Sequence, residues 1–137
     1  MSSKKRLILL DYDGTIIDFN DKPKLAIPSQ YLKNLINDIC KKENTDVYII
    51  SGRDQKFLSK HFNDLSINLI AEHGYFKKPV NKTWIEPNFL ENQDWMTDLL
   101  PIFETFTDRT PGTFIEKKKT SLVWHYRKTD PELASER

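Results

Sequence analysis

With 137 residues, the chain fits one modest domain, and its 21 basic and 20 acidic residues create no net charge that would suggest a nucleic-acid partner. Its one cysteine, Cys40, excludes an internal disulfide framework, and no apolar run approaches the ~20 residues of a membrane span. We therefore expect a soluble, cytoplasmic protein that acts without nucleic acid or a membrane.

The first predicted strand ends in two carboxylates. Residues 7–10 are large and apolar, which is typical of a strand buried on both faces of a parallel sheet. Asp11 and Asp13 follow and point the same way along an extended backbone, at a cost unless a cation or electrophile lies between them. Ligands of open α/β sheets bind beyond the carboxyl ends of the strands, so both residues are candidate catalytic and metal-binding groups. The ordinary alternative is an acidic turn at Asp13-Gly14.

A helix and a second strand follow. Apolar residues at helical spacing between residues 31 and 40 predict a helix that Ser29 caps, and residues 47–50 read as another buried strand. Strand, helix and strand in this order form a parallel crossover, which brings the two strand ends side by side.

A candidate anion site follows the second strand. Ser51, Gly52 and Arg53 supply a hydroxyl, a flexible backbone and a bidentate cation, and together they could bind an oxyanion. The ordinary alternative is a turn in which Arg53 pairs with Asp54.

The middle of the chain continues the sheet and then changes character. A short helix with Phe57, Leu58 and Phe62 on its inner face leads to a third strand at residues 67–71. His73, after this strand, could be a ligand or an acid–base group, but we expect it to be merely hydrogen-bonded. Residues 76–87 suit a short hairpin rather than another crossover.

The last third of the chain predicts a helix followed by a hairpin. The helix begins near Glu91, and Pro101 should kink or restart it. Residues 113–127 alternate with period two around a turn near residues 118–120, and residues 129–132 open a further helix. One face of the hairpin is polar, which indicates either a solvated sheet face or a specificity surface; its residues are Glu116, Lys118, His125 and Arg127.

Four motifs together resemble those of the trehalose-6-phosphate phosphatases, a family within the haloacid-dehalogenase-type phosphatases. They are D-Y-D-G-T at 11–15, S-G-R-D at 51–54, A-E-H-G at 71–74 and R-T-P-G-T-F-I-E-K-K-K-T-S-L-V-W-H-Y-R at 109–127. The resemblance covers residues 5–133 and implies an α/β fold, a Rossmann-like parallel-sheet core with an inserted α/β cap. Residues 1–76 would form the N-terminal part of the core, and residues 77–137 a linker and the first part of the cap.

The resemblance also implies a reaction, the Mg²⁺-dependent hydrolysis of trehalose 6-phosphate through an aspartyl phosphate. Asp11 would be the nucleophile and Asp13 the general acid and base, with Mg²⁺ held at both. The remaining assignments are phosphate binding by Ser51, Gly52 and Arg53, and contacts to trehalose hydroxyls by Glu116, Lys118 and Arg127.

This chain departs from the family pattern in its last part. Family members return to the core with a lysine and a G-D-D motif, and neither is present here, which implies a chain that stops within the cap and turns over little or no substrate. The implied partners are a synthase-like domain or other subunits of trehalose synthesis. The alternative function is a non-catalytic sugar-phosphate-binding or regulatory module of the same ancestry.

Overall fold

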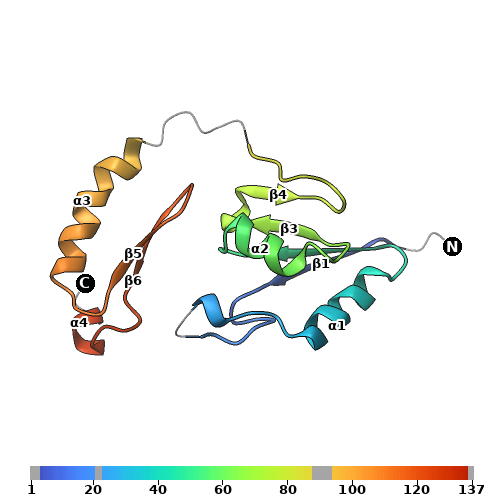
Figure 1. The fold of residues 1–137 in the computed structure, drawn as a ribbon, viewed down its shortest axis with the longest axis horizontal. Coiled ribbons are helices and arrows are strands. Elements are labelled where there is room, and N and C mark those ends of the chain that lie inside the picture. The colour runs from blue at the N-terminus through green and yellow to red at the C-terminus, as the bar shows by residue number, and fades with distance from the viewer. Residues whose placement is uncertain (1–3, 21–22, 88–93, 136–137) are drawn as a thin grey trace. The chain divides into compact units, whose positions relative to one another are not determined.

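The computed structural model describes residues 4–20, 23–87 and 94–135. The chain forms two compact units, Met1–Pro87 and Asn88–Arg137, and each is described by itself (Figure 1). Within the described residues, no helix is long and apolar enough to cross a membrane.

The first unit is built on a four-stranded sheet in the order β1-β2-β3-β4. Strands β1 (Arg6–Asp11), β2 (Thr45–Ile50) and β3 (Asn68–Ala71) are parallel, and β4 (Phe76–Lys78) runs antiparallel to β3. The three predicted strands and their parallel order are therefore confirmed. The connections hold α1 (Gln30–Cys40), α2 (Gln55–Phe62) and two 3₁₀ turns, η1 (Pro23–Leu25) and η2 (Glu72–Gly74).

Both helices pack on the same face of this sheet. Ile36 of α1 and Leu58 and Phe62 of α2 share one buried cluster with alternate residues of β2 and β3. Each helix begins at a side-chain cap: the Ser29 hydroxyl accepts a bond from the amide of Leu32, and the Asp54 carboxylate accepts from the amide of Phe57. The predicted cap at Ser29 is confirmed.

Strand β1 is not buried on both faces, which corrects the sequence-based expectation. Ile8 and Leu10 pack against the core, but Leu7 and Leu9 on the opposite face are 61% and 56% exposed. The reason is topological, since α1 and α2 both cover the face of Ile8 and leave the opposite face of β1 exposed.

The predicted hairpin after β3 is present. Strand β4 pairs with β3, and Lys77 forms an antiparallel bridge with Ile85. The Trp84 ring packs against the core, and its indole N–H donates to the Ser59 hydroxyl at 2.9 Å. The first unit therefore continues beyond residue 76.

The second unit contains α3 (Asp94–Asp108), an antiparallel hairpin of β5 (Phe114–Lys117) and β6 (Leu122–His125), and α4 (Pro131–Ser135). The turn between the strands is closed by a bond from the amide of Lys118 to the carbonyl of Ser121, near the predicted position. Asp130 caps α4 as the sequence indicates, because its carboxylate accepts a bond from the amide of Glu132 at 2.9 Å.

Helix α3 runs through Pro101 without a break, so of the two expected outcomes the restart is wrong, and the kink stays a prediction. Proline removes one helical hydrogen bond, but α3 packs on β5 and β6, and these contacts help to keep the helix continuous. The predicted start near Glu91 lies outside the described residues.

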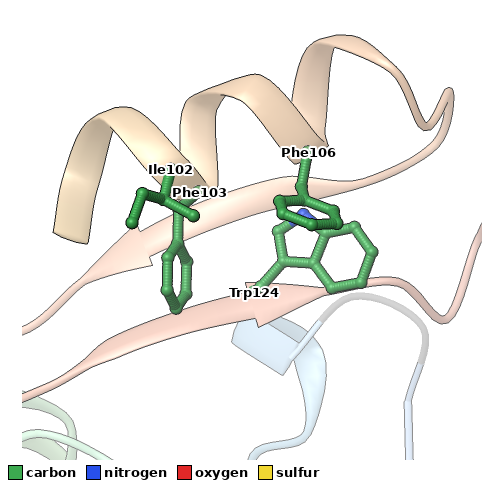
Figure 2. A pocket seen from close by; sticks show the side chains of 4 residues that line it. All are labelled: Ile102, Phe103, Phe106 and Trp124. Carbon is green, nitrogen blue, oxygen red and sulfur yellow. The ribbon is translucent and has the colours of Figure 1, made fainter.

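An open apolar pocket lies between α3 and the hairpin (Figure 2). Ile102, Phe103 and Phe106 of α3 and Trp124 of β6 line it. The Trp124 indole N–H donates to the Thr107 hydroxyl at 3.1 Å, so its polar atom is satisfied at the edge of α3. With an almost entirely apolar lining, this pocket does not suit a sugar phosphate.

Candidate active site

The motif that carries Asp11 and Asp13 and the motif that carries Ser51 lie at the ends of neighbouring strands, as predicted. In the pairing of β1 with β2, Asp11 lies opposite Ile50, so Ser51 is the first residue after the end of the adjacent strand. Ser51 is only 3% exposed, and its amide donates to the carbonyl of Ile70 at 3.0 Å. The parallel crossover thus puts both motifs at one edge of the sheet. A close approach of the Asp11 carboxylate to the Ser51 hydroxyl stays a prediction.

Asp11 is exposed at the end of β1 and has a hydroxyl partner. The Thr15 hydroxyl donates to its carboxylate at 2.9 Å. The chain turns sharply here, because the amides of Ile16 and Ile17 both donate to the carbonyl of Tyr12 and Gly14 adopts φ +83°. This turn leaves the Asp11 carboxylate accessible to a substrate while a neighbouring side chain orients it.

Tyr12 anchors the backbone between the two carboxylates. Its side chain is fully buried, and its ring makes edge-to-face contacts with Phe57 and Phe62. Its hydroxyl donates to the carbonyl of Ala26 at 2.8 Å. Burial raises the pKa of Tyr12 to about 12, and the nearby Arg53 charge opposes this shift. Sequence reasoning did not single out Tyr12, although one apolar residue between two carboxylates at period two is the signal of an inward-facing side chain.

Arg53 pairs with Asp13 in a bidentate arrangement. Its Nε donates to one carboxylate oxygen at 2.9 Å and its Nη2 to the other at 2.6 Å. A third donor, Nη1, bonds the carbonyl of Pro23 at 2.7 Å. Arg53 does not pair with Asp54, the ordinary alternative, because the Asp54 carboxylate caps α2 instead.

The loop that follows β2 is tied to the loop that follows β3. The Ser51 hydroxyl accepts a bond from the amide of Arg53 at 3.0 Å, and the Ser51 carbonyl accepts from the amide of His73 at 3.1 Å. A side chain at Gly52 would lie 2.5 Å from the His73 ring, so only glycine permits this close approach. The His73 ring therefore packs over the loop of residues 51–53, the candidate phosphate-binding loop, and the backbone amide of His73 bonds to this loop.

Asp11 and Asp13 are the natural donors for a divalent cation. Mg²⁺ is commonly held by one or two carboxylates together with substrate phosphate oxygens and waters, and two carboxylates at a strand end fit that donor set. Within the described residues, no third histidine, cysteine, aspartate or glutamate joins them to complete a cluster. Each carboxylate oxygen of Asp13 already accepts a bond from Arg53.

The second unit presents the predicted polar face on its hairpin. Glu116 lies on the face of Phe114 and His125, which are opposite each other in the pairing of β5 with β6. The Glu116 carboxylate contacts His125 Nε2 at 2.8 Å and Lys118 Nζ at 3.9 Å. The Phe114 ring stacks on the His125 ring with centroids 4.4 Å apart.

Glu116 and Lys118 thus lie together, as predicted. Arg127 is exposed two residues beyond β6, and its reach to the same surface stays a prediction. The sequence places His125 on the same polar face but predicts no contact for it, whereas the structure pairs its Nε2 with the Glu116 carboxylate.

Comparison with known proteins identifies the relatives of this chain. The family model described as Trehalose-phosphatase matches residues 9–137. Over 134 residues the chain is 43% identical to a trehalose-phosphatase of Saccharomyces cerevisiae, covering 96% of this chain but 15% of that protein. The chain therefore spans less than a fifth of the length of this curated relative.

Solved structures agree with this result. The C-terminal domain of Candida albicans trehalose-6-phosphate phosphatase has a TM-score of 0.91 at 38% identity, covering 96% of this chain and 46% of that one. The C-terminal domain of a Candida albicans trehalose synthase regulatory protein has a TM-score of 0.71 at 26% identity, covering 90% of this chain and 42% of that one. A haloacid dehalogenase-like hydrolase from B. subtilis, at 14% identity and TM-score 0.60, shares the fold alone, over 85% of this chain and 38% of that one. The predicted fold class is confirmed.

Proposed function

Because the chain belongs to the trehalose-phosphatase family, we propose that it carries the nucleophile and phosphate-binding motifs of an enzyme that hydrolyses trehalose 6-phosphate to trehalose and phosphate. The observation that carries this proposal is the pairing of Asp11 with Ile50, which brings Asp11 and Ser51 to neighbouring strand ends. The partners proposed for the enzyme are a synthase-like domain or other subunits of trehalose synthesis.

Asp11 is the proposed nucleophile. Its carboxylate oxygen attacks phosphorus in line, so that a new bond joins aspartate to phosphorus while the bond from phosphorus to the sugar oxygen breaks. Asp13 gives a proton to the departing sugar oxygen and then takes one from the water that hydrolyses the aspartyl phosphate. The exposure of Asp11 and its bond from Thr15 support this assignment, because a nucleophile must be both accessible and oriented.

Ser51 and the backbone of Gly52 are the proposed phosphate-binding groups. The Ser51 hydroxyl follows a buried strand, and the loop is fixed by bonds to the loop after β3, so its donors are preorganised. Mg²⁺ would be held by Asp11 and Asp13. When bound, it supplies positive charge that offsets the repulsion between the Asp11 carboxylate and the phosphate.

The polar face of the second unit is the proposed sugar-reading surface. Glu116, Lys118 and Arg127 are charged hydrogen-bonding groups, and a surface of this kind discriminates strongly against a substrate that leaves them unpaired. The contact of Glu116 with both His125 and Lys118 supports this role, because it holds the carboxylate ready to accept from a sugar hydroxyl.

A regulatory module remains the second candidate. It is favoured by the likeness to the C-terminal domain of the Candida albicans regulatory protein, which shares the fold at lower identity. The presence of both Asp11 and Asp13 distinguishes the two functions, since a module without turnover has no need of a nucleophile beside an acid–base group.

The test is phosphate release from trehalose 6-phosphate by the full-length protein. Asp11→Asn should abolish both turnover and the phosphorylated intermediate, whereas Asp13→Asn should slow both half-reactions by about 10²–10⁴-fold. Asp38→Asn, the same chemical change on the exposed surface of α1, is the matched control and should leave the rate unchanged. A phosphorylated intermediate in Asp11→Asn, or full turnover in Asp13→Asn, would refute the assignments.

A further inference from the structure

We propose that Arg53 is a positioning residue for Asp13, and that its guanidinium orients this carboxylate rather than binding the phosphate of the substrate. The inference rests on the proposed phosphatase activity, which gives Asp13 its part in proton transfer. It replaces the phosphate-binding role that the S-G-R motif suggests for Arg53.

The contact between the two side chains fixes the plane of the carboxylate. Each oxygen of Asp13 accepts one bond from a different nitrogen of Arg53, at 2.9 and 2.6 Å, so the two planar groups lie edge to edge. The pair is partly shielded, with side-chain exposures of 14% for Arg53 and 31% for Asp13. It therefore differs from a freely exposed ion pair, whose geometry is weakly held.

Arg53 is itself held by other segments of the first unit. Its Nη1 bonds the carbonyl of Pro23 in η1, and its guanidinium lies 4.5 Å from the centre of the Phe57 ring in α2. Its backbone carbonyl accepts a bond from the amide of Glu72 at 3.0 Å. Two of these contacts hold the guanidinium and the third holds the backbone, so Arg53 can impose an orientation on its partner instead of following it.

The same contacts argue against a phosphate ligand. Bidentate binding of a phosphate requires one edge of the guanidinium, with two nitrogens side by side. Asp13 takes the edge formed by Nε and Nη2, and Pro23 takes a donor on the adjoining edge. A phosphate bound in this way would have to displace one of them.

The consequence for the reaction concerns the leaving group. An acid–base group that is misplaced by about 1 Å can lose about 10²-fold in rate. A sugar oxygen leaves poorly unless it is protonated, whereas the nitrophenolate of p-nitrophenyl phosphate leaves without protonation. Loss of Arg53 should therefore lower kcat/KM, which covers the steps up to release of the leaving group, much more for the sugar phosphate than for the nitrophenyl ester, and loss of Asp13 should give the same pattern. Hydrolysis of the aspartyl phosphate also uses Asp13 and is common to both esters, so kcat alone does not make this distinction.

The experiment measures kcat and KM for both esters in the full-length protein, with Arg53→Gln, Asp13→Asn and the double variant. Arg53→Gln should lower kcat for trehalose 6-phosphate by about 10²-fold with little change in KM. The double variant should be little slower than Asp13→Asn, because both changes act on one group. Arg53→Lys should recover little, since an ammonium keeps the charge but cannot form two parallel bonds.

Controls separate this role from the alternatives. Arg6→Gln, the same change at the exposed start of β1, should leave both substrates unaffected. Inhibition by inorganic phosphate should be unchanged in Arg53→Gln. If Arg53→Gln does not fold, the split between the two substrates is measured in Arg53→Lys.

A rise in KM for both esters with weaker inhibition by phosphate would overturn the inference and make Arg53 a phosphate ligand. Equal losses of kcat/KM on both esters, or multiplying losses in the double variant, would also overturn it. A wild-type protein that releases no phosphate from either ester would instead refute the proposed function, and the inference with it.

Discussion

The Tyr12 hydroxyl offers a sharp test of how the candidate site is anchored. Tyr12→Phe removes one oxygen atom and keeps the ring that packs edge to face on Phe57 and Phe62. What is lost is the bond at 2.8 Å to the carbonyl of Ala26, a residue that is itself buried. The change therefore isolates one buried hydrogen bond.

The expected cost is about 1–2 kcal/mol of unfolding free energy. A buried hydrogen bond contributes about 0.5–1.5 kcal/mol, and an acceptor that is left buried without a donor raises the cost above the middle of that range. Tyr31→Phe is the matched control, because Tyr31 is 78% exposed and the same change there should alter stability by less than about 0.5 kcal/mol.

The assay is urea unfolding followed through the amide signals of β2, which reports on the first unit separately from the second. Equal free energies of unfolding for Tyr12→Phe and Tyr31→Phe would refute the reasoning. A loss well above ~3 kcal/mol would also refute it, since that requires more than one unsatisfied group.

The same residue predicts a pH dependence. Burial raises the pKa of Tyr12 to about 12, whereas tyrosine in the unfolded chain titrates near 10. As pH rises from about 10 to about 12, the unfolded chain loses a proton that the folded chain keeps, so this contribution to stability is full below pH 10 and falls above it. Tyr12→Phe lacks the effect, and the stability gap between wild type and variant should narrow over this range.

Three further predictions concern other parts of the chain. Gly112→Ala should destabilise the second unit by more than ~1 kcal/mol, because φ is +90° and the added Cβ would lie 2.5 Å from the carbonyl of Lys128. Gly74→Ala is the control, since its φ is +107° but the space around it is open, and equal losses of unfolding free energy in the two variants would remove the steric argument. Glu116→Ala should raise KM for trehalose 6-phosphate about 10-fold or more while leaving p-nitrophenyl phosphate nearly unaffected, and a similar rise for both would exclude sugar reading. Ser29→Ala should cost about 1 kcal/mol in urea unfolding by removing the cap of α1, and an unchanged midpoint would contradict it.

Short-range chemistry made much of this fold predictable. The parallel order follows from apolar runs separated by a helical pattern, and the caps at Ser29 and Asp130 follow from side chains that bond amides within three residues. The meeting of Asp11 with the end of β2 follows from the crossover alone.

What could not be predicted depends on contacts distant in sequence or on covering layers. Arg53 and Asp13 are 40 positions apart, and nothing local distinguishes this pairing from one with Asp54. The exposure of Leu7 and Leu9 could not be inferred, because an apolar run gives the character of the side chains and not whether anything packs on them. Pro101 stays inside a continuous helix because tertiary packing overrides its local cost.

The position of β1 bears on how the 137-residue chain behaves in concentrated solution. No other described strand pairs with its outer edge, and Leu7 and Leu9 lie exposed beside that edge. An unpaired edge with neighbouring apolar side chains is a template for strand addition by another molecule. In the described chain before Asp11 the charged residues are Lys4, Lys5 and Arg6, and Lys5 pairs with Asp46 at 2.7 Å. Their positive charge opposes edge-to-edge association at the start of the strand. The 137-residue chain should therefore become more prone to self-association as salt screens these positive charges.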